Sequence, residues 1–240
     1  MSFVDIHHHI IYGLDDGPQT FEESVDMLRA ACHDGIGTII ATTHASPGER
    51  DFPLEAYRER LKELNDYCQL HTLPLQLLQG AEIFFAESAV RHLQAGRIPT
   101  LANSQHILVE FSPDVDYEEL FTGLRQLANA GFLPVLAHIE RYECLVRKPG
   151  LALEIKNDLP VKFQVNCRSL VRRKGMRFRR FLRKVLDARM IDCVATDAHN
   201  TDSRKVCMEE GYVALAGCYE QEYADELTWL NQRSILSNSL

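Results

Sequence analysis

Two histidines, His7 and His9, directly follow the first short apolar run of this sequence. Residues i and i+2 of a β-strand lie on the same face, so the two rings should point together while His8 points away. Imidazole and carboxylate groups without a thiolate are ligands that suit Mn, Fe, Zn and related ions. The His-x-His pair therefore predicts a metal site at the end of the first strand.

Side chains of the same chemical kind stand where later apolar runs end. The candidate metal ligands are His7, His9, Asp16, His44, Glu82, Glu110, His138, Asp197 and His199. One such residue alone is more often a cap or a solvated loop residue, but nine at equivalent places are difficult to explain by chance. Nine ligands exceed the need of a single ion, so the sequence predicts a cluster of two or three divalent ions with a bridging carboxylate.

The elements that must position these ligands alternate along the chain. The apolar runs expected to be strands are residues 3–6, 38–42, 75–81, 107–111, 133–137, 161–165 and 193–195. The helical patterns are residues 20–33, 54–70, 88–95, 117–130, 176–188 and 203–215. This alternation predicts an α/β fold with a parallel sheet, and seven strands favour a barrel whose functional groups gather at the C-terminal ends of the strands. We expect a single domain over residues 1–240.

Composition limits the classes of protein that the chain can represent. It has 240 residues, of which 45% are hydrophobic, and a net charge of −8. This usage is typical of a globular protein, and the acidity disfavours binding to nucleic acid or anionic membranes. No run approaches the roughly 18 apolar residues of a spanning helix. The N-terminus lacks a signal-peptide pattern and the seven cysteines are scattered, so we expect a cytoplasmic protein with reduced thiols.

A set of short motifs resembles a known family. They lie at residues 5–10, 15–18, 42–44, 80–83, 98–101, 109–111, 137–142, 164–166 and 196–200. In these motifs the sequence resembles the PHP (polymerase and histidinol phosphatase) superfamily, and within it the bacterial manganese-dependent protein-tyrosine phosphatases of the CpsB/YwqE type. Asp15-Asp16-Gly17-Pro18 and His138-Ile139-Glu140-Arg141-Tyr142 are specific to that branch.

The resemblance implies a distorted (β/α)₇ TIM-like barrel, the PHP fold, with a trinuclear site. It implies one ion held by His7, His9, Glu82 and Asp197, a second by Glu82, Glu110 and His138, and a third by Asp16, His44 and His199. It also implies that Arg141 and Arg204 grip phosphate oxygens, so that the expected catalytic residues are Arg141, Arg204, His138 and Asp197. Manganese is the ion that the family implies, with Fe, Zn and Mg as alternatives.

The chemistry of such a cluster favours phosphate esters. Three divalent ions and four carboxylates leave a surplus of about +2, which attracts a phosphate dianion. A hydroxide that bridges two ions is a nucleophile at neutral pH. A phenolate leaving group, whose conjugate acid has a pKa of about 10, needs less protonation than an alkoxide. These considerations favour an aryl phosphate as substrate. The resemblance implies a protein-tyrosine phosphatase, with an autophosphorylating bacterial tyrosine kinase of capsule or exopolysaccharide synthesis as its partner.

Other functions stay open at this point. A small-molecule phosphatase of the histidinol-phosphate type and a phosphodiesterase would use the same cluster. Outside the enzymes, the alternative is a metal-stabilised regulatory domain. We expect neither a nucleic-acid partner nor a membrane span, and the sequence leaves open the physiological metal, the phosphoprotein and whether the chain forms a homo-oligomer.

Two further features need an interpretation. Cys167 and Arg173 fit the C-x5-R spacing of cysteine phosphatases, but no glycine lies between them, so we expect a buried thiol near the strand of Asn166 and not a nucleophile.

Nine Lys and Arg residues lie in the segment from Arg168 to Lys184, these two included. They indicate a solvated helix face or, alternatively, a docking surface for an acidic phosphotyrosine segment of a partner kinase; nucleic-acid binding is a weaker third interpretation.

Overall fold

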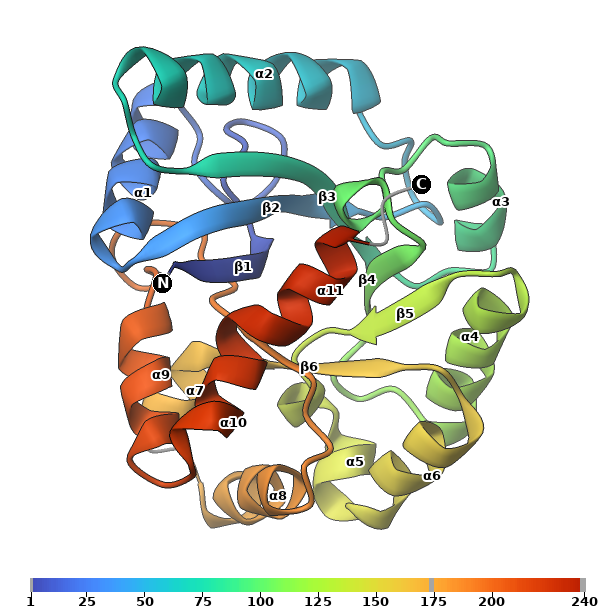
Figure 1. Cartoon of the computed structure of the whole chain (residues 1–240). Coiled ribbons are helices and arrows are strands. Elements are labelled where there is room, and N and C mark those ends of the chain that lie inside the picture. Colours follow the sequence, from blue (N-terminus) through green and yellow to red (C-terminus); the bar gives the residue numbers. More distant parts are fainter. Residues whose placement is uncertain (1, 173–174, 238–240) are drawn as a thin grey trace.

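In residues 2–172 and 175–237, which the computed structural model describes, seven parallel strands form one sheet (Figure 1). The strands are β1 (Phe3–His8), β2 (Ile36–Ala45), β3 (Gln76–Phe84), β4 (His106–Glu110), β5 (Leu133–Leu136), β6 (Lys162–Asn166) and β7 (Cys193–Ala195). Their order in the sheet is their order in the chain, and each pairs in parallel with the next. The predicted succession of strands is confirmed.

Helices connect the strands and surround the sheet (Figure 1). They are α1 (Phe21–His33), α2 (Leu54–Leu70), α3 (Ala89–Gln94), η1 (Leu101–Asn103), α4 (Tyr117–Asn129), η2 (Ile139–Arg141), α5 (Glu143–Arg147), α6 (Gly150–Asp158), α7 (Cys167–Val171), α8 (Met176–Asp187), α9 (Met208–Ala216), α10 (Gln221–Asp225), the π-helical turn η3 (Glu226–Leu230) and α11 (Asn231–Ser237). Five of the six predicted helices agree with α1, α2, α3, α4 and α8 to within one residue at each end. Across the described ranges, no helix has both the length and the apolarity that a membrane span requires.

The predicted helix over residues 203–215 is wrong in its first turn and a half. Helix α9 begins only at Met208. The side chain of Asn200 accepts hydrogen bonds from the backbone N–H groups of Asp202 at 3.0 Å and Arg204 at 2.9 Å. Such side-chain bonds compete with the helical pattern and stabilise a turn. As a result, Arg204 lies in a tight loop, and its carbonyl oxygen accepts the N–H of His199 at 2.9 Å.

The interior of the barrel is a separate apolar cluster. Its buried members are Val4, Ile6, Ile40, Leu101, Ala102, Leu108, Val135, Ala137, Cys193, Ala195 and Ile235. Ile235 belongs to α11, which lies across the barrel opening that faces the viewer in Figure 1. The side chains of Asn231 and Gln232 tie this helix to the carbonyl oxygens of Asp192 at 2.9 Å and Val194 at 3.2 Å. The C-terminal helix therefore covers the end at which the strands begin and leaves the other end open.

The sheet closes on itself at that other end. The N–H of Asp197 donates to the carbonyl oxygen of His7 at 2.8 Å, and the N–H of His9 donates to that of Ala198 at 2.9 Å. These bonds join β1 to the segment that follows β7. The result is a distorted seven-stranded barrel, as predicted, and its closing contact lies among the candidate metal ligands.

Candidate metal centre

The candidate ligands lie together where the strands end. In a barrel, every second side chain of a strand faces the interior. The interior rows that end in a ligand are Ile40–Thr42–His44, Leu78–Gly80–Glu82, Leu108–Glu110 and Cys193–Ala195–Asp197. Each row begins with an apolar side chain in the barrel interior and reaches a candidate ligand two or four residues later in the chain. Because β2 and β3 are longer than predicted, His44 and Glu82 lie within their strands and not after them.

Strand β1 places its histidines through an irregularity. Ile6 packs in the interior, so strict alternation would place His8 there. The pairing of β1 with β2 shifts register before His8, and the Nε2 atoms of His7 and His9 lie 3.3 Å apart. The prediction that these two rings point together is confirmed. His8 is buried, and burial lowers its pKa to about 3, so its ring is neutral.

Two ligand residues adopt left-handed backbone conformations. His138 has φ of 35° and Asp197 has φ of 52°. Residues other than glycine avoid this region, at a cost of about 1–3 kcal/mol each. The side chain of Gln164 accepts the N–H of His138 at 2.8 Å, and the carbonyl of His7 accepts the N–H of Asp197 at 2.8 Å. The surrounding strands thus hold both residues in turns that bring their side chains to the centre.

The ligand atoms form three overlapping groups. Within each group the atoms lie no more than 4.8 Å from one another, and the groups are His9, Asp16, His44 and His199; His7, His9, Glu82 and Asp197; and His44, Glu82 and Glu110. The Nε2 atom of His138 lies 3.0 Å from Glu82 and 3.4 Å from Glu110. The structure therefore brings all nine predicted ligand residues to one place.

In three of the histidines, the ring nitrogen Nδ1, which points away from the centre, lies next to a hydrogen-bond acceptor. The pairs are His7 Nδ1 with Gln164 Oε1 at 3.2 Å, His9 Nδ1 with Asp15 Oδ2 at 2.7 Å and His199 Nδ1 with the carbonyl oxygen of Asp197 at 3.1 Å. Each acceptor stabilises a proton on Nδ1, so the Nε2 lone pair points to the centre. This arrangement is the usual one for histidines that bind metal. Together with the carboxylates, these residues fit divalent cations.

The electrostatics of the centre agree with a cation site. Burial alone would lower the pKa of His44, but hydrogen bonds to Asp16 and Glu110 outweigh it and raise that pKa to about 11. Burial alone would raise the pKa of Glu82, but electrostatic attraction to His7 and hydrogen bonds with His138, His7 and His9 hold that pKa well below its usual range. The buried carboxylates stabilise positive charge beside them, whether it is carried by protons or by metal ions.

Two arginines border the centre. Arg141 donates a hydrogen bond to a carboxylate oxygen of Asp197. Arg204 reaches Asp16 at 2.9 Å and the other oxygen of Asp197 at 3.0 Å. The side chains of Arg141 and Arg204 are 35% and 31% exposed, so both guanidinium groups lie at the boundary between the ligands and the solvent.

The centre opens on the side of Asp16. The side chain of Asp16 is 58% exposed, whereas that of Glu82 is 1% exposed. A hollow of about 440 Å³ adjoins this side and is lined by Gly13, Leu14, Asp15, Asp16, Gln19, His44, Ser46 and Arg50. Glu82 therefore forms the floor of the centre, and Asp16 and His44 lie at its mouth.

Three residues at the site belong to motifs noted in the sequence but were assigned neither a ligand nor a catalytic role there. Asp15 orients His9, as described above, and its side chain is 1% exposed, in contrast to that of its neighbour Asp16. Gln164 donates to Asn166 at 2.8 Å, and Asn166 donates to Asp197 at 2.7 Å. Gln164 and Asn166 alternate at the end of β6, which carries no His, Asp or Glu there. Polar side chains at i and i+2 of that strand end were the signal that could have identified them.

Cys167 does not take part in this centre. It is the first residue of α7, it is fully buried, and its sulfur lies 3.5 Å from that of Met208. Burial raises the pKa of its thiol well above the usual range. A buried, protonated thiol is a poor nucleophile. Arg173, the other residue of the C-x5-R spacing, lies outside the described residues.

Comparison with known proteins finds relatives that the chain matches over most of their length. The family model for capsular polysaccharide synthesis, CpsB/CapC, matches residues 3–237. The tyrosine-protein phosphatase CpsB of Streptococcus pneumoniae is 33% identical over 243 residues, which cover 99% of each chain. The tyrosine-protein phosphatase YwqE of Bacillus subtilis strain 168 is 32% identical over 230 residues, covering 95% of this chain and 87% of that protein.

A solved structure shows the same fold. It comes from the crystal structures of YwqE from Bacillus subtilis and CpsB from Streptococcus pneumoniae, which are described as metal-dependent tyrosine phosphatases. It matches with a TM-score of 0.88 at 29% identity, and the match covers 99% of this chain and 95% of the other. The match therefore spans the whole barrel.

Proposed function

Because the chain belongs to the CpsB/CapC family of capsular polysaccharide synthesis, we propose that it is a metal-dependent protein-tyrosine phosphatase. Its relatives in sequence and in structure carry that activity in their names. The observation that carries the proposal is the meeting of the nine ligand residues with Arg141 and Arg204 at one opening. A metal-dependent phosphate-ester hydrolase needs bound cations to activate water and arginines to bind the phosphate oxygens, and the residues for both lie side by side here.

The number of lone pairs suggests how ions would be shared. The Nδ1 atom of His9 faces Asp15, so only its Nε2 remains for an ion, and His9 can serve just one of the two groups that contain it. Glu82 has two carboxylate oxygens and can bridge. We therefore assign one ion to His7, His9, Glu82 and Asp197, a second to Glu82, Glu110 and His138, and a third to Asp16, His44 and His199. Manganese is proposed for these positions, with Fe, Zn and Mg as alternatives.

The residues around the ions would bind and orient the phosphate. When bound, the divalent ions supply positive charge and a water of lowered pKa. Asp197 holds Arg141 on one oxygen and Arg204 on the other, so the two guanidinium groups are fixed on either side of one carboxylate. Planar guanidinium donors match phosphate oxygens, and they stabilise the charge that these oxygens carry as the ester bond breaks.

The leaving group favours an aryl ester. A phenol has a pKa of about 10, far below that of an alcohol, so phenolate leaves with less help from a general acid. This reasoning supports phosphotyrosine over histidinol phosphate. The finer proposal is a phosphotyrosine protein as substrate, specifically an autophosphorylating bacterial tyrosine kinase of capsule or exopolysaccharide synthesis.

The test compares two substrates on one preparation. Phosphate release from a phosphotyrosine peptide and from L-histidinol phosphate is measured on chelator-stripped protein, with and without added Mn²⁺. We expect Mn²⁺ to restore turnover, with the peptide preferred. Preference for histidinol phosphate would indicate a small-molecule phosphatase in place of a protein-tyrosine phosphatase. Metal binding without turnover of either ester would favour a diesterase or a regulatory domain.

A substitution at the rim of the centre tests the role of the arginines. Arg141→Ala should lower kcat/KM for the peptide by about 10²–10³-fold, because a charged donor to the phosphate is lost. Its metal content, measured by elemental analysis, should stay the same. Arg147→Ala is the matched control, since Arg147 is exposed on α5 and pairs only with Glu143 among the ion pairs of the described residues. Full activity in Arg141→Ala would contradict the assigned role.

A further inference from the structure

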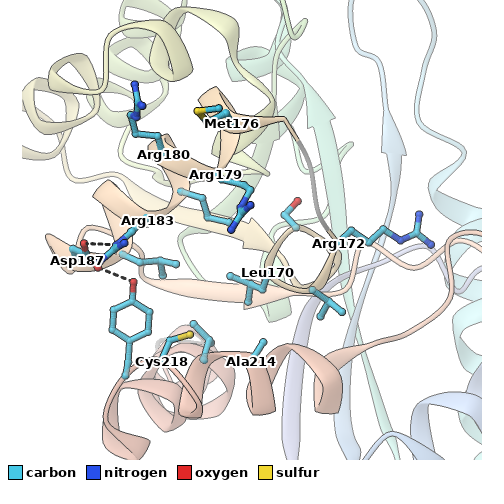
Figure 2. A pocket seen from close by; sticks show the side chains of 15 residues that line it. Leu170, Arg172, Met176, Arg179, Arg180, Arg183, Asp187, Ala214 and Cys218 are labelled. Atoms are coloured by element: carbon cyan, nitrogen blue, oxygen red, sulfur yellow. Dashed lines mark hydrogen bonds and ion pairs between the residues drawn. The ribbon is translucent and has the colours of Figure 1, made fainter.

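A second hollow lies away from the metal centre, between α7, α8 and α9 (Figure 2). Its volume is about 950 Å³, more than twice the 440 Å³ at the mouth of the centre. Its floor is apolar and includes Leu170, Leu182 and Leu215. Met176, at its edge, is 76% exposed. We name this hollow the α7–α9 groove.

Arginines surround this apolar floor. Arg172, Arg179, Arg180 and Arg183 line the α7–α9 groove, with Asp187 as its acidic residue. In Figure 2 the side chain of Arg179 extends into the groove, whereas that of Arg180 points away from it. Arg180 also borders a neighbouring hollow of about 420 Å³, together with Arg147 and Arg177. This side of the molecule is thus basic, although the whole chain has a net charge of −8.

The acidic residue of the groove is already engaged. A carboxylate oxygen of Asp187 lies 3.5 Å from Nε of Arg183, and the hydroxyl of Tyr219 donates to Asp187 at 2.8 Å. No ion pair within the described residues involves Arg179 or Arg180. Arginines around an apolar floor, two of them without an ion pair among the described residues, complement a ligand that carries both carboxylates and an apolar side chain.

The groove connects to the metal centre through α7. Ser169 lines the groove, and its hydroxyl donates to Glu140 at 2.6 Å, next to Arg141 in the chain. Arg172, which directly follows α7, donates to the carbonyl oxygen of Ser203 at 3.4 Å, next to Arg204. Both contacts end beside an arginine of the metal centre. Helix α7 therefore lies between the metal centre and the groove.

We infer that the α7–α9 groove binds an acidic segment of the phosphoprotein substrate, flanking its phosphotyrosine, with an apolar side chain of that segment on the leucine floor. The inference rests on the proposed function and deepens it by naming the substrate class: phosphotyrosine in an acidic sequence context. A concave, apolar floor suits a peptide. A membrane surface would instead bind to a flat basic face, and a single-stranded nucleic acid would bind to a basic surface with aromatic rings on which its bases stack.

The kinetic test separates the groove from the chemistry. Two phosphotyrosine peptides are compared, one rich in Asp and Glu with one Phe, and one in which Asn and Gln replace the acids. p-Nitrophenyl phosphate serves as a substrate too small to reach the groove. Wild-type protein should show the lower KM for the acidic peptide. The double variant Arg179→Glu/Arg183→Glu should raise that KM by on the order of tenfold, with kcat and p-nitrophenyl phosphate turnover unchanged.

Matched variants control for net charge and for volume. Arg58→Glu/Arg125→Glu changes the net charge equally on α2 and α4 and should leave the KM for the acidic peptide as in wild type. Ala214→Phe should fill the floor without a change of charge and raise the KM for the acidic peptide. Val213→Phe introduces the same aromatic side chain at a neighbouring residue that is 62% exposed and should have no effect.

A binding assay keeps the inference testable if turnover fails. Fluorescence anisotropy of the unphosphorylated acidic peptide should show binding to wild type and loss of binding in Arg179→Glu/Arg183→Glu. If wild type hydrolyses neither peptide nor p-nitrophenyl phosphate, the proposed function fails while this assay still decides on the groove. Equal KM values for the two peptides, or binding of phosphatidylglycerol vesicles or of an oligonucleotide through these arginines in place of the peptide, would overturn the inference.

Discussion

Gln164 lies fully buried beneath the metal centre and contacts three parts of it. Its Oε1 atom accepts the N–H of His138 at 2.8 Å and lies 3.2 Å from Nδ1 of His7, while its amide nitrogen donates to Asn166 at 2.8 Å. A neutral amide can both accept and donate, so it orients a ligand ring without adding charge to the site. Gln164 is therefore a positioning residue for the ligands around it.

The substitution Gln164→Met tests this at the scale of one residue. It keeps a side chain of similar length but removes the acceptor for His7 and His138. We expect metal affinity to fall by about 10–100-fold, as is typical when a hydrogen-bond partner of a metal ligand is lost. Calorimetric titration of chelator-stripped protein with Mn²⁺ measures the change. Gln126→Met, on the exposed face of α4, is the control, and equal affinity in both variants would refute the role.

Among the elements, the segment between β1 and α1 depends on a close approach to the barrel. A Cβ atom at Gly17 would lie 2.7 Å from the carbonyl oxygen of His9 and 2.9 Å from a carboxylate oxygen of Asp15. The N–H of Gly17 donates to Asp15 at 3.0 Å, and Asp15 also accepts the N–H of His44 at 3.0 Å. Only glycine lets this segment lie directly on the end of β1 and carry Asp16 to the mouth of the centre.

Gly17→Ala should consequently disturb the metal centre more than the fold. The added methyl group would push the segment away from His9 and withdraw Asp16 from its place beside His44 and His199. We expect elemental analysis to find less Mn bound per chain, and turnover to fall with it. In Gly150→Ala the new Cβ would meet no atom within 4 Å, so metal content should be unchanged. Full metal content in Gly17→Ala would show that the segment adapts.

For the whole molecule, the two ends of the barrel are stabilised by different means. At one end α11 inserts Ile235 into the interior cluster and covers it. At the other end, β1 and the residues after β7 meet where Glu82 and Asp197 are almost fully buried. Buried carboxylates cost free energy unless cations accompany them. Bound divalent ions should therefore stabilise the closure of the barrel as well as supply the chemistry.

Metal removal tests this at the scale of the whole fold. A ligand that binds only the native state stabilises it, by about 2.7 kcal/mol when present at 100 times its Kd. Chelation should thus lower the thermal unfolding midpoint, and Mn²⁺ should restore it. Glu82→Gln should lose most of this Mn²⁺-dependent shift, whereas Glu154→Gln, on the exposed side of α6, should keep it. An unfolding midpoint that does not respond to chelation would contradict a structural role of the ions.

The amino-acid sequence by itself determined the order of the strands, five helices and the nine candidate ligand residues, which the structure brings together. These features depend on local periodicity and on the position of a residue relative to the end of its strand. Rows such as Leu108–Glu110 follow from the alternation of side chains alone. The helix N-terminus at Thr20, whose side chain accepts the N–H of Glu23, is equally local.

Only the tertiary structure decided how these residues meet. His7 and His9 face the centre because β1 shifts its register against β2, and His138 does so because its backbone is held in a left-handed turn by Gln164. Arg204 reaches the centre because its loop is not the helix that the sequence predicts. For β1 and His138 a partner distant in the chain overrides the local preference, and a hydrogen bond across that distance has no periodic trace in the sequence. At Arg204 the side chain of Asn200, four residues earlier, stabilises a turn against the helical pattern.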